Sequence, residues 1–162
     1  MRAKSGFTLV EILIVVVILG ILAAIVIPQF TNASTEAKQS SLTSDLQAVR
    51  SQIELYKIQH NENLPGTQGS VSFVDALTSK TNQDGVVGTD IALFRYGPYM
   101  QSLPQNPFND LGTVATGTSK LTAVGDNLAG WYFVTSGVDA GVFQANDNKT
   151  NVLDSDKPHS QY

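Results

Sequence analysis

The sequence contains no cysteine, and only 15% of its 162 residues are charged. Without cysteine the chain has no disulfide bond, no thiolate zinc site and no cysteine nucleophile. The absence does not identify a compartment, because an exported protein need not contain cysteine. The hydrophobic fraction of 42% is too high for a disordered chain, and the length is typical of one compact domain. If the protein is exported, packing alone must hold that domain together.

Recognisable catalytic motifs are lacking as well. The only histidines are His60 and His159, and neither lies at a spacing typical of a zinc site or a catalytic triad, so we expect both on the surface. There is no glycine-rich phosphate loop and no nucleophile elbow, and the acidic residues are scattered without close pairing. The sequence therefore predicts a protein that is not an enzyme.

One long apolar run lies close to the N-terminus. The 21 residues from Phe7 to Ile27 would form a helix about 31 Å long, enough to cross a hydrocarbon core of about 30 Å. The short flank before it carries Arg2 and Lys4, which predicts a cytoplasmic N-terminus. A secretory signal has a shorter core of about 7–15 residues. On hydropathy alone, an uncleaved signal anchor is the simplest interpretation.

Glu11 does not fit a simple anchor. It is the only acidic residue before residue 31. A charged side chain costs roughly 2.5–3.5 kcal/mol at the centre of a membrane helix, and less toward its end, so it usually has a partner or a function. If the chain were cut between Gly6 and Phe7, the new α-amino group would lie one helical turn from Glu11. Pairing within one chain or between neighbours would then offset the cost of burial.

The segment Gly6 to Glu11, with the sequence Gly-Phe-Thr-Leu-Val-Glu, resembles the prepilin signal of type IV pilins and type II secretion pseudopilins. The resemblance implies cleavage after Gly6 by a prepilin peptidase and N-methylation of the new terminus at Phe7. It also implies that Glu11 contacts the terminus of a neighbouring subunit during assembly.

The same resemblance implies an organisation and a set of partners. Residues 1–6 would be the leader peptide, 7–30 the transmembrane and filament-core helix, and 31–162 an exported head, periplasmic or extracellular. The N-terminus of this single inner-membrane span would face the cytoplasm, and the assembled filament would be extracytoplasmic. The partners would be copies of this chain or related pilin-like subunits, the inner membrane, the prepilin peptidase and an assembly platform protein.

Gly20 and Pro28 occupy positions between which some assembled pilins lose helical structure. Glycine is a poor helix residue and proline lacks the N–H for a ladder bond, so we expect the helix to extend or bend most easily here. The alternative is that Pro28 only kinks the helix where it leaves the membrane.

The second half of the predicted helix is amphipathic. Apolar residues recur there at spacings of three and four, at Leu42, Leu46, Val49, Ile53 and Tyr56. We expect the helix to run to about His60 and to stop in residues 61–66, which end in Leu-Pro-Gly. The repeat is too short for a sustained coiled coil, so this face is predicted to pack on the domain's own sheet.

The remaining chain predicts a small sheet. Residues 66–127 are mostly connection, with a short helix at 73–79 and an ordered, proline-fixed loop at 96–108 whose Gly-Pro-Tyr and Leu-Pro-x-x-Pro-aromatic strings are similar to those of secretion pseudopilins. Strands at 130–135 and 141–145 flank a glycine-containing turn. We therefore expect an α+β head, with a long helix packed against a small antiparallel sheet and residues 146–162 as a loop or frayed tail.

The charge of the head bears on its ligands. It holds 13 of the 14 acidic residues and 8 of the 10 bases, which argues against non-specific nucleic-acid binding. Asp139, Asp147, Asp154 and Asp156 concentrate oxygen ligands near the C-terminus, as calcium requires, and major pseudopilins commonly bind calcium in a C-terminal loop. The alternative is a solvated polar tail, and no other cofactor is predicted.

Together these patterns favour a filament subunit of a type II secretion pseudopilus that polymerises from the inner membrane to move exported proteins. One alternative is a surface type IV pilin for adhesion, twitching motility or DNA uptake. The other is a monomeric, signal-anchored binding domain, for which Glu11 would be dispensable.

Overall fold

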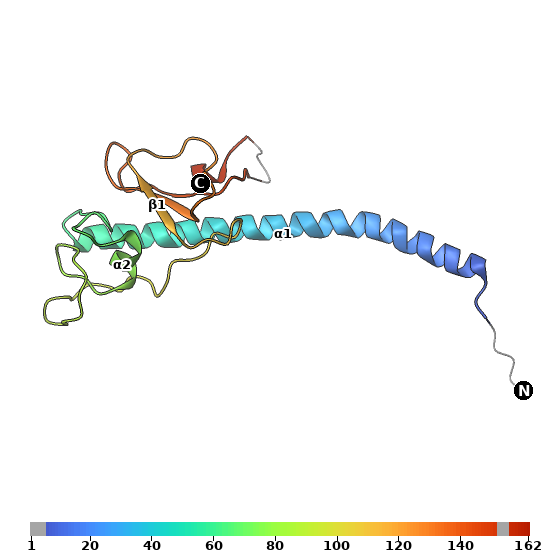
Figure 1. The fold of residues 1–162 in the computed structure, drawn as a ribbon, viewed down its shortest axis with the longest axis horizontal. Helices are drawn as coiled ribbons and strands as arrows, with labels where there is room; N and C mark the ends of the chain where they lie inside the picture. Colours follow the sequence, from blue (N-terminus) through green and yellow to red (C-terminus); the bar gives the residue numbers. More distant parts are fainter. Residues whose placement is uncertain (1–5, 152–155) are drawn as a thin grey trace, which may run out of the picture. The chain divides into compact units, whose positions relative to one another are not determined.

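The computed structural model describes residues 6–151 and 156–162 (Figure 1). Contacts divide the chain into two compact units, Met1–Ala37 and Lys38–Tyr162. The element order is one long helix, one short helix, three strands and a final turn of 3₁₀ helix. We describe each unit by itself.

The first unit consists mainly of the N-terminal part of helix α1, which spans Leu9–Gln59 without interruption. Its apolar side chains are exposed, from Phe7 at 78% to Phe30 at 77%. Of the helices in the described residues, α1 alone is long and apolar enough to cross a membrane. An exposed apolar surface of this extent indicates a surrounding of lipid or of other protein.

In the second unit, the C-terminal part of α1 contributes its predicted stripe to the core. Leu42, Leu46, Val49, Ile53 and Tyr56 are all buried, which confirms the prediction that this face packs on the domain itself. They share one cluster with α2 (Phe73–Thr78) and with the aromatic residues of two strands, namely Trp131, Phe133 and Phe143. Ser72 caps the N-terminus of α2, because its hydroxyl accepts a hydrogen bond from the Asp75 amide.

The sheet has three strands in the order β1 (Val114–Gly117), β2 (Trp131–Val134) and β3 (Phe143–Ala145). Strands β2 and β3 form the predicted antiparallel hairpin, with Phe133 opposite Phe143. The expectation of a wholly antiparallel sheet is wrong, because β1 pairs with β2 in parallel. The connection 118–130 is long enough for the crossover that parallel pairing requires. The fold is thus α+β with a mixed sheet.

Residues 146–162 were expected to form a loop or a frayed tail, and the described part, 146–151 and 156–162, is an ordered loop that ends in one 3₁₀ turn. Thr150 and Pro158 form a β-bridge, and the 3₁₀ helix η1 (His159–Gln161) contacts β3. Asn146 and Asp147 are buried directly after β3. The polar residues of this segment can be buried because their side chains bond to one another and to the backbone.

Candidate functional site

The N-terminal motif forms a capping box at the start of α1. The amide of Glu11 donates a hydrogen bond to the Thr8 hydroxyl at 3.2 Å, and the amide of Thr8 donates to the Glu11 carboxylate at 3.5 Å. The pattern Thr-x-x-Glu satisfies amide groups that a helix start otherwise leaves unpaired. The bond to the Thr8 amide points the Glu11 carboxylate back toward the chain's N-terminus.

The bond between Gly6 and Phe7 lies just outside the helix. Residues 6–8 are non-helical and exposed, and a side chain built on Gly6 would meet no atom within 4 Å. A protease needs an accessible, locally extended backbone. Both residues that flank this bond are thus exposed and outside the helix.

Gly20 and Pro28 both lie within continuous helix, so no break occurs between them in this structure. Pro28 has no amide hydrogen, so the ladder bond to the carbonyl of Ala24 is missing. Open space surrounds Gly20. Glycine and proline both disfavour helix, and the helix is nevertheless intact at these two positions.

The head contains a buried polar network around Asp147. Its carboxylate lies 2.8 Å from His159 Nδ1 and accepts bonds from the Asn106 side-chain amide at 2.8 Å and the Lys149 amide at 3.0 Å. Burial alone would raise the pKa of Asp147, but the hydrogen bonds from His159 and Asn106 hold it below its usual value. Asn106 also donates to the Gly130 carbonyl oxygen at 2.9 Å. The network joins the 96–108 loop, the end of β3 and η1.

The four aspartates proposed for calcium do not form one site among the described residues. Asp139 lies 3.4 Å from Lys120 Nζ, and Asp147 is engaged as above. Asp154 lies outside the described residues, and Asp156 has interactions of its own. In the ranges 6–151 and 156–162, no cluster of three or more His, Asp or Glu side chains could hold a metal ion.

The expectation of two surface histidines is wrong, because His60 and His159 are both fully buried. His60 directly follows α1 and stacks on Tyr56 with ring centroids 3.8 Å apart. Its Nδ1 lies 2.8 Å from the Tyr56 carbonyl oxygen and its Nε2 lies 2.9 Å from the Thr81 hydroxyl. Burial lowers the pKa of His60 despite the bonds to the backbone. These contacts give both histidines a structural role.

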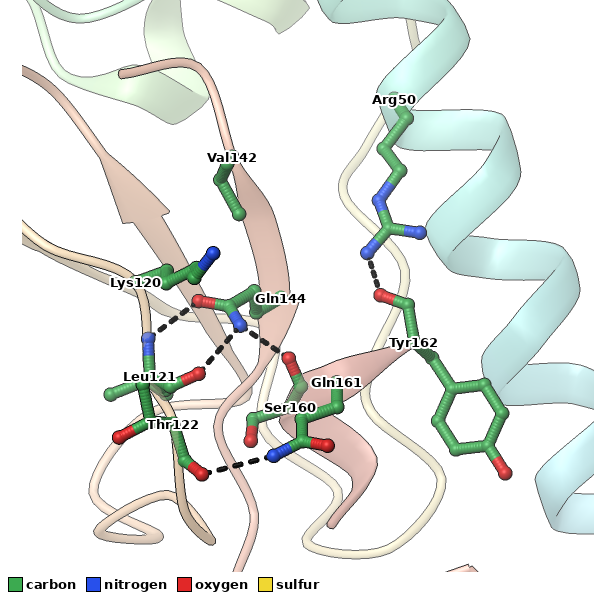
Figure 2. A pocket seen from close by; sticks show the side chains of 9 residues that line it. All are labelled: Arg50, Lys120, Leu121, Thr122, Val142, Gln144, Ser160, Gln161 and Tyr162. Atoms are coloured by element: carbon green, nitrogen blue, oxygen red, sulfur yellow. Dashed lines mark hydrogen bonds between the residues drawn. The ribbon is translucent and has the colours of Figure 1, made fainter. Parts of the chain in front are cut away.

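Arg50 ties α1 to the edge of the sheet. Its Nε and Nη2 donate to the Phe143 carbonyl oxygen at 3.1 and 2.7 Å. Nη2 also donates to the Tyr162 carbonyl oxygen, and Figure 2 marks this bond. Sequence reasoning missed this role, along with those of Asn106 and His159, because the contacting groups are 12 or more residues apart and form no recognisable motif. The prolines of the 96–108 loop predicted an ordered segment, but they did not indicate that its Asn106 would be buried.

Comparison with known proteins supports the motif and extends to the head. Residues 1–27 match the family described as the prokaryotic N-terminal methylation motif. The chain is 35% identical over 109 residues to the type II secretion system core protein G of Aeromonas hydrophila, covering 67% of this chain and 71% of that protein. The protein of the same name from Pseudomonas aeruginosa is 35% identical over 127 residues, covering 72% and 78%. That of Vibrio cholerae is 31% identical over 110 residues, covering 68% and 69%. No solved structure matches the chain significantly.

Proposed function

Because this chain belongs to the family of the type II secretion system core protein G, we propose that it is a non-enzymatic pseudopilin that polymerises from the inner membrane into a filament for protein export. The observation that carries the proposal is the identity to these relatives, which covers most of the chain and not only the shared N-terminal motif. A surface pilin would share that motif equally, so similarity across the head is what favours the secretion system.

The exposed apolar half of α1 supports a polymer anchored in the membrane. Among the described residues of the first unit, 6–37, no surface covers the apolar side chains from Phe7 to Phe30. Lipid would cover them before assembly, and the same residues of neighbouring subunits would cover them in the filament. A monomeric anchor would use only the first of these surroundings and would not require Glu11.

Processing at the N-terminus is part of the proposal. Cleavage after Gly6 by a prepilin peptidase and methylation of Phe7 would leave a cationic amine one turn from Glu11. The carboxylate of one subunit would then bind the amine of its neighbour, which offsets the cost of burying either charge alone. The leader would face the cytoplasm, the head would be exported, and an assembly platform protein would receive the mature subunit.

Gly20 to Pro28 would serve as the adjustable part of the helix. The missing ladder bond at Pro28 and the poor helix propensity of Gly20 lower the cost of extending this segment when subunits pack. Faster amide hydrogen exchange at 20–28 than at 12–19 in assembled filaments would support the idea. Equal protection of both segments would count against it.

Replacement of Glu11 tests the proposal directly. Glu11→Ala should abolish filaments while the mature protein still begins at a methylated Phe7, as measured by mass spectrometry. Glu36→Ala is the matched control, because Glu36 is another exposed acidic residue of α1 and should leave assembly unchanged. Normal filaments and secretion with Glu11→Ala, together with an intact Met1, would refute the proposal.

A further inference from the structure

The sequence contains two acceptor motifs for N-linked glycans. Such a motif is an asparagine followed two residues later by serine or threonine, with any residue except proline between them. Asn32-Ala-Ser and Asn148-Lys-Thr fit this pattern, and no other asparagine of the chain does. A motif of three residues arises readily by chance, so the surroundings of each asparagine decide whether a transferase can modify it.

The Asn32 motif is part of helix α1, which does not present it to a transferase. Residues two apart on an α-helix point about 200° apart around its axis, so they do not face each other. The Asn32 amide and the Ser34 hydroxyl therefore project to different sides of α1. An enzyme that must contact both groups at once cannot do so on this helix.

The Asn148 motif lies in a loop that the head holds at its surface. Residues 148–150 are non-helical and all three are exposed. The preceding Asp147 is buried, and its carboxylate accepts a hydrogen bond from the Lys149 amide at 3.0 Å. The carbonyl oxygen of Lys149 accepts a second bond, from the amide of the buried His159 at 3.2 Å. These anchors fix the backbone beneath Asn148 and leave its side chain outside.

The two side chains that a transferase must contact are unobstructed. Thr150 pairs with Pro158 in a β-bridge, which uses its backbone and leaves its side chain available. In the part of the chain that the structure describes, neither the Asn148 amide nor the Thr150 hydroxyl has a hydrogen-bond partner. Other asparagines after β1 or before it use their side-chain amides to donate to neighbouring groups, namely Asn106, Asn109 and Asn146.

We propose that Asn148 is an N-glycosylation site of the head. The co-substrate would be a sugar whose C1 atom is linked to a diphosphate, carried by a polyprenol in the membrane or by a nucleoside in the cytoplasm. The nitrogen of the Asn148 side chain forms a bond to C1, and the bond between C1 and the diphosphate oxygen breaks. The diphosphate leaves with that electron pair, and the amide releases one proton.

A glycan at Asn148 has a consequence for assembly. Glycans are bulky and solubilising, so the loop 148–150 would face solvent in the filament and would not contact a neighbouring subunit. This consequence rests on the proposed function, because it requires a filament. The modification itself requires only the exposed motif.

Mass spectrometry of the mature protein, purified from the cells that produce it naturally, tests the proposal. The parent should be heavier than its polypeptide by one glycan, and peptide mapping should place that glycan on Asn148. Asn148→Gln should lose the whole excess mass, whereas Asn32→Gln, the matched control, should keep it. Thr150→Ala should also lose it and Thr150→Ser should keep it, since serine retains the hydroxyl. An inhibitor of polyprenyl-phosphate recycling removes the glycan if the donor is polyprenyl-linked and leaves it if the donor is a nucleotide sugar.

The outcomes separate this inference from the proposed function. A parent of unmodified mass, or a glycan mapped to Asn32 or to any other residue, overturns the proposal. If a variant does not accumulate, the peptide map of the parent decides by itself. Filaments built from unmodified subunits overturn the glycosylation and leave the filament role standing. A chain that carries the glycan on Asn148 but forms no filaments overturns the filament role and leaves the glycosylation standing.

Discussion

The imidazole of His159 lies 2.8 Å from the carboxylate of Asp147, and both side chains are completely buried. The pair joins η1 to the residues that follow β3. Removing one member of a buried pair leaves the other desolvated and unpaired, which costs more than the intact pair contributes. The C-terminal segment is thus held in place by an internal polar contact at a position where the sequence suggested solvent.

Asp147→Ala should lower the free energy of unfolding by about 3–5 kcal/mol, because it leaves His159 and Asn106 without their acceptor. Urea unfolding of the full chain in detergent, followed through the fluorescence of the buried Trp131, measures the change. Asp139→Ala is the control: its partner Lys120 is half-exposed, so we expect a loss of at most about 1 kcal/mol. Equal losses for the two variants would show that the buried network does not stabilise the head.

The head should become less stable as the pH falls from about 7 to about 5, because of His60. Burial lowers the pKa of His60 in the folded chain below its ordinary value of 6.5, so the unfolded chain takes up the proton first. The contribution of neutral His60 to the free energy of unfolding is therefore fully present above pH 6.5. It declines as the pH falls toward the lower pKa that His60 has in the folded chain. Urea unfolding of the parent and of His60→Gln at several pH values measures this dependence. The same slope in both would exclude His60 as its source.

Thr8→Val should reduce filament yield, whereas Thr8→Ser should assemble like the parent. Valine has nearly the same shape but cannot accept the hydrogen bond from the Glu11 amide, and loss of an N-cap costs about 1 kcal/mol. The measurement is the filament fraction released by shearing, divided by the total amount of the protein. Normal assembly of Thr8→Val at normal abundance would mean that the capping box does not prepare Glu11 for its partner.

Calcium should not raise the melting temperature of the head through Asp139 or Asp147. Both carboxylates already have protein partners, and an ion would have to displace Lys120 from one and His159 from the other. Melting curves with about 1 mM calcium and with a chelator test this, since extracellular calcium sites bind in that range. A calcium-dependent rise that disappears in Asp139→Ala would contradict the expectation and reinstate the calcium site.

Some features of the head followed from local pattern. The stripe from Leu42 to Tyr56 was visible as helical periodicity, and the β2–β3 hairpin as two aromatic-rich segments around a glycine turn. Strand β1 was not visible, because Val-Ala-Thr-Gly lacks aromatic residues and carries only one clearly apolar β-branched side chain. Its parallel pairing depends on where the 118–130 connection returns, which no local pattern encodes.

The sequence by itself determined the N-terminal motif, the apolar span and its single acidic residue, because each depends on the order of neighbouring residues along one helix. It equally determined the family, through identity across most of the chain. Only the tertiary structure decided the fate of the polar residues in the head. Asp147 lies 12 residues from His159 and 41 from Asn106 along the chain, and only folding brings the three together in a space that excludes water. A polar side chain is exposed or buried according to whether the fold supplies its partners, and those partners are chosen by packing in three dimensions.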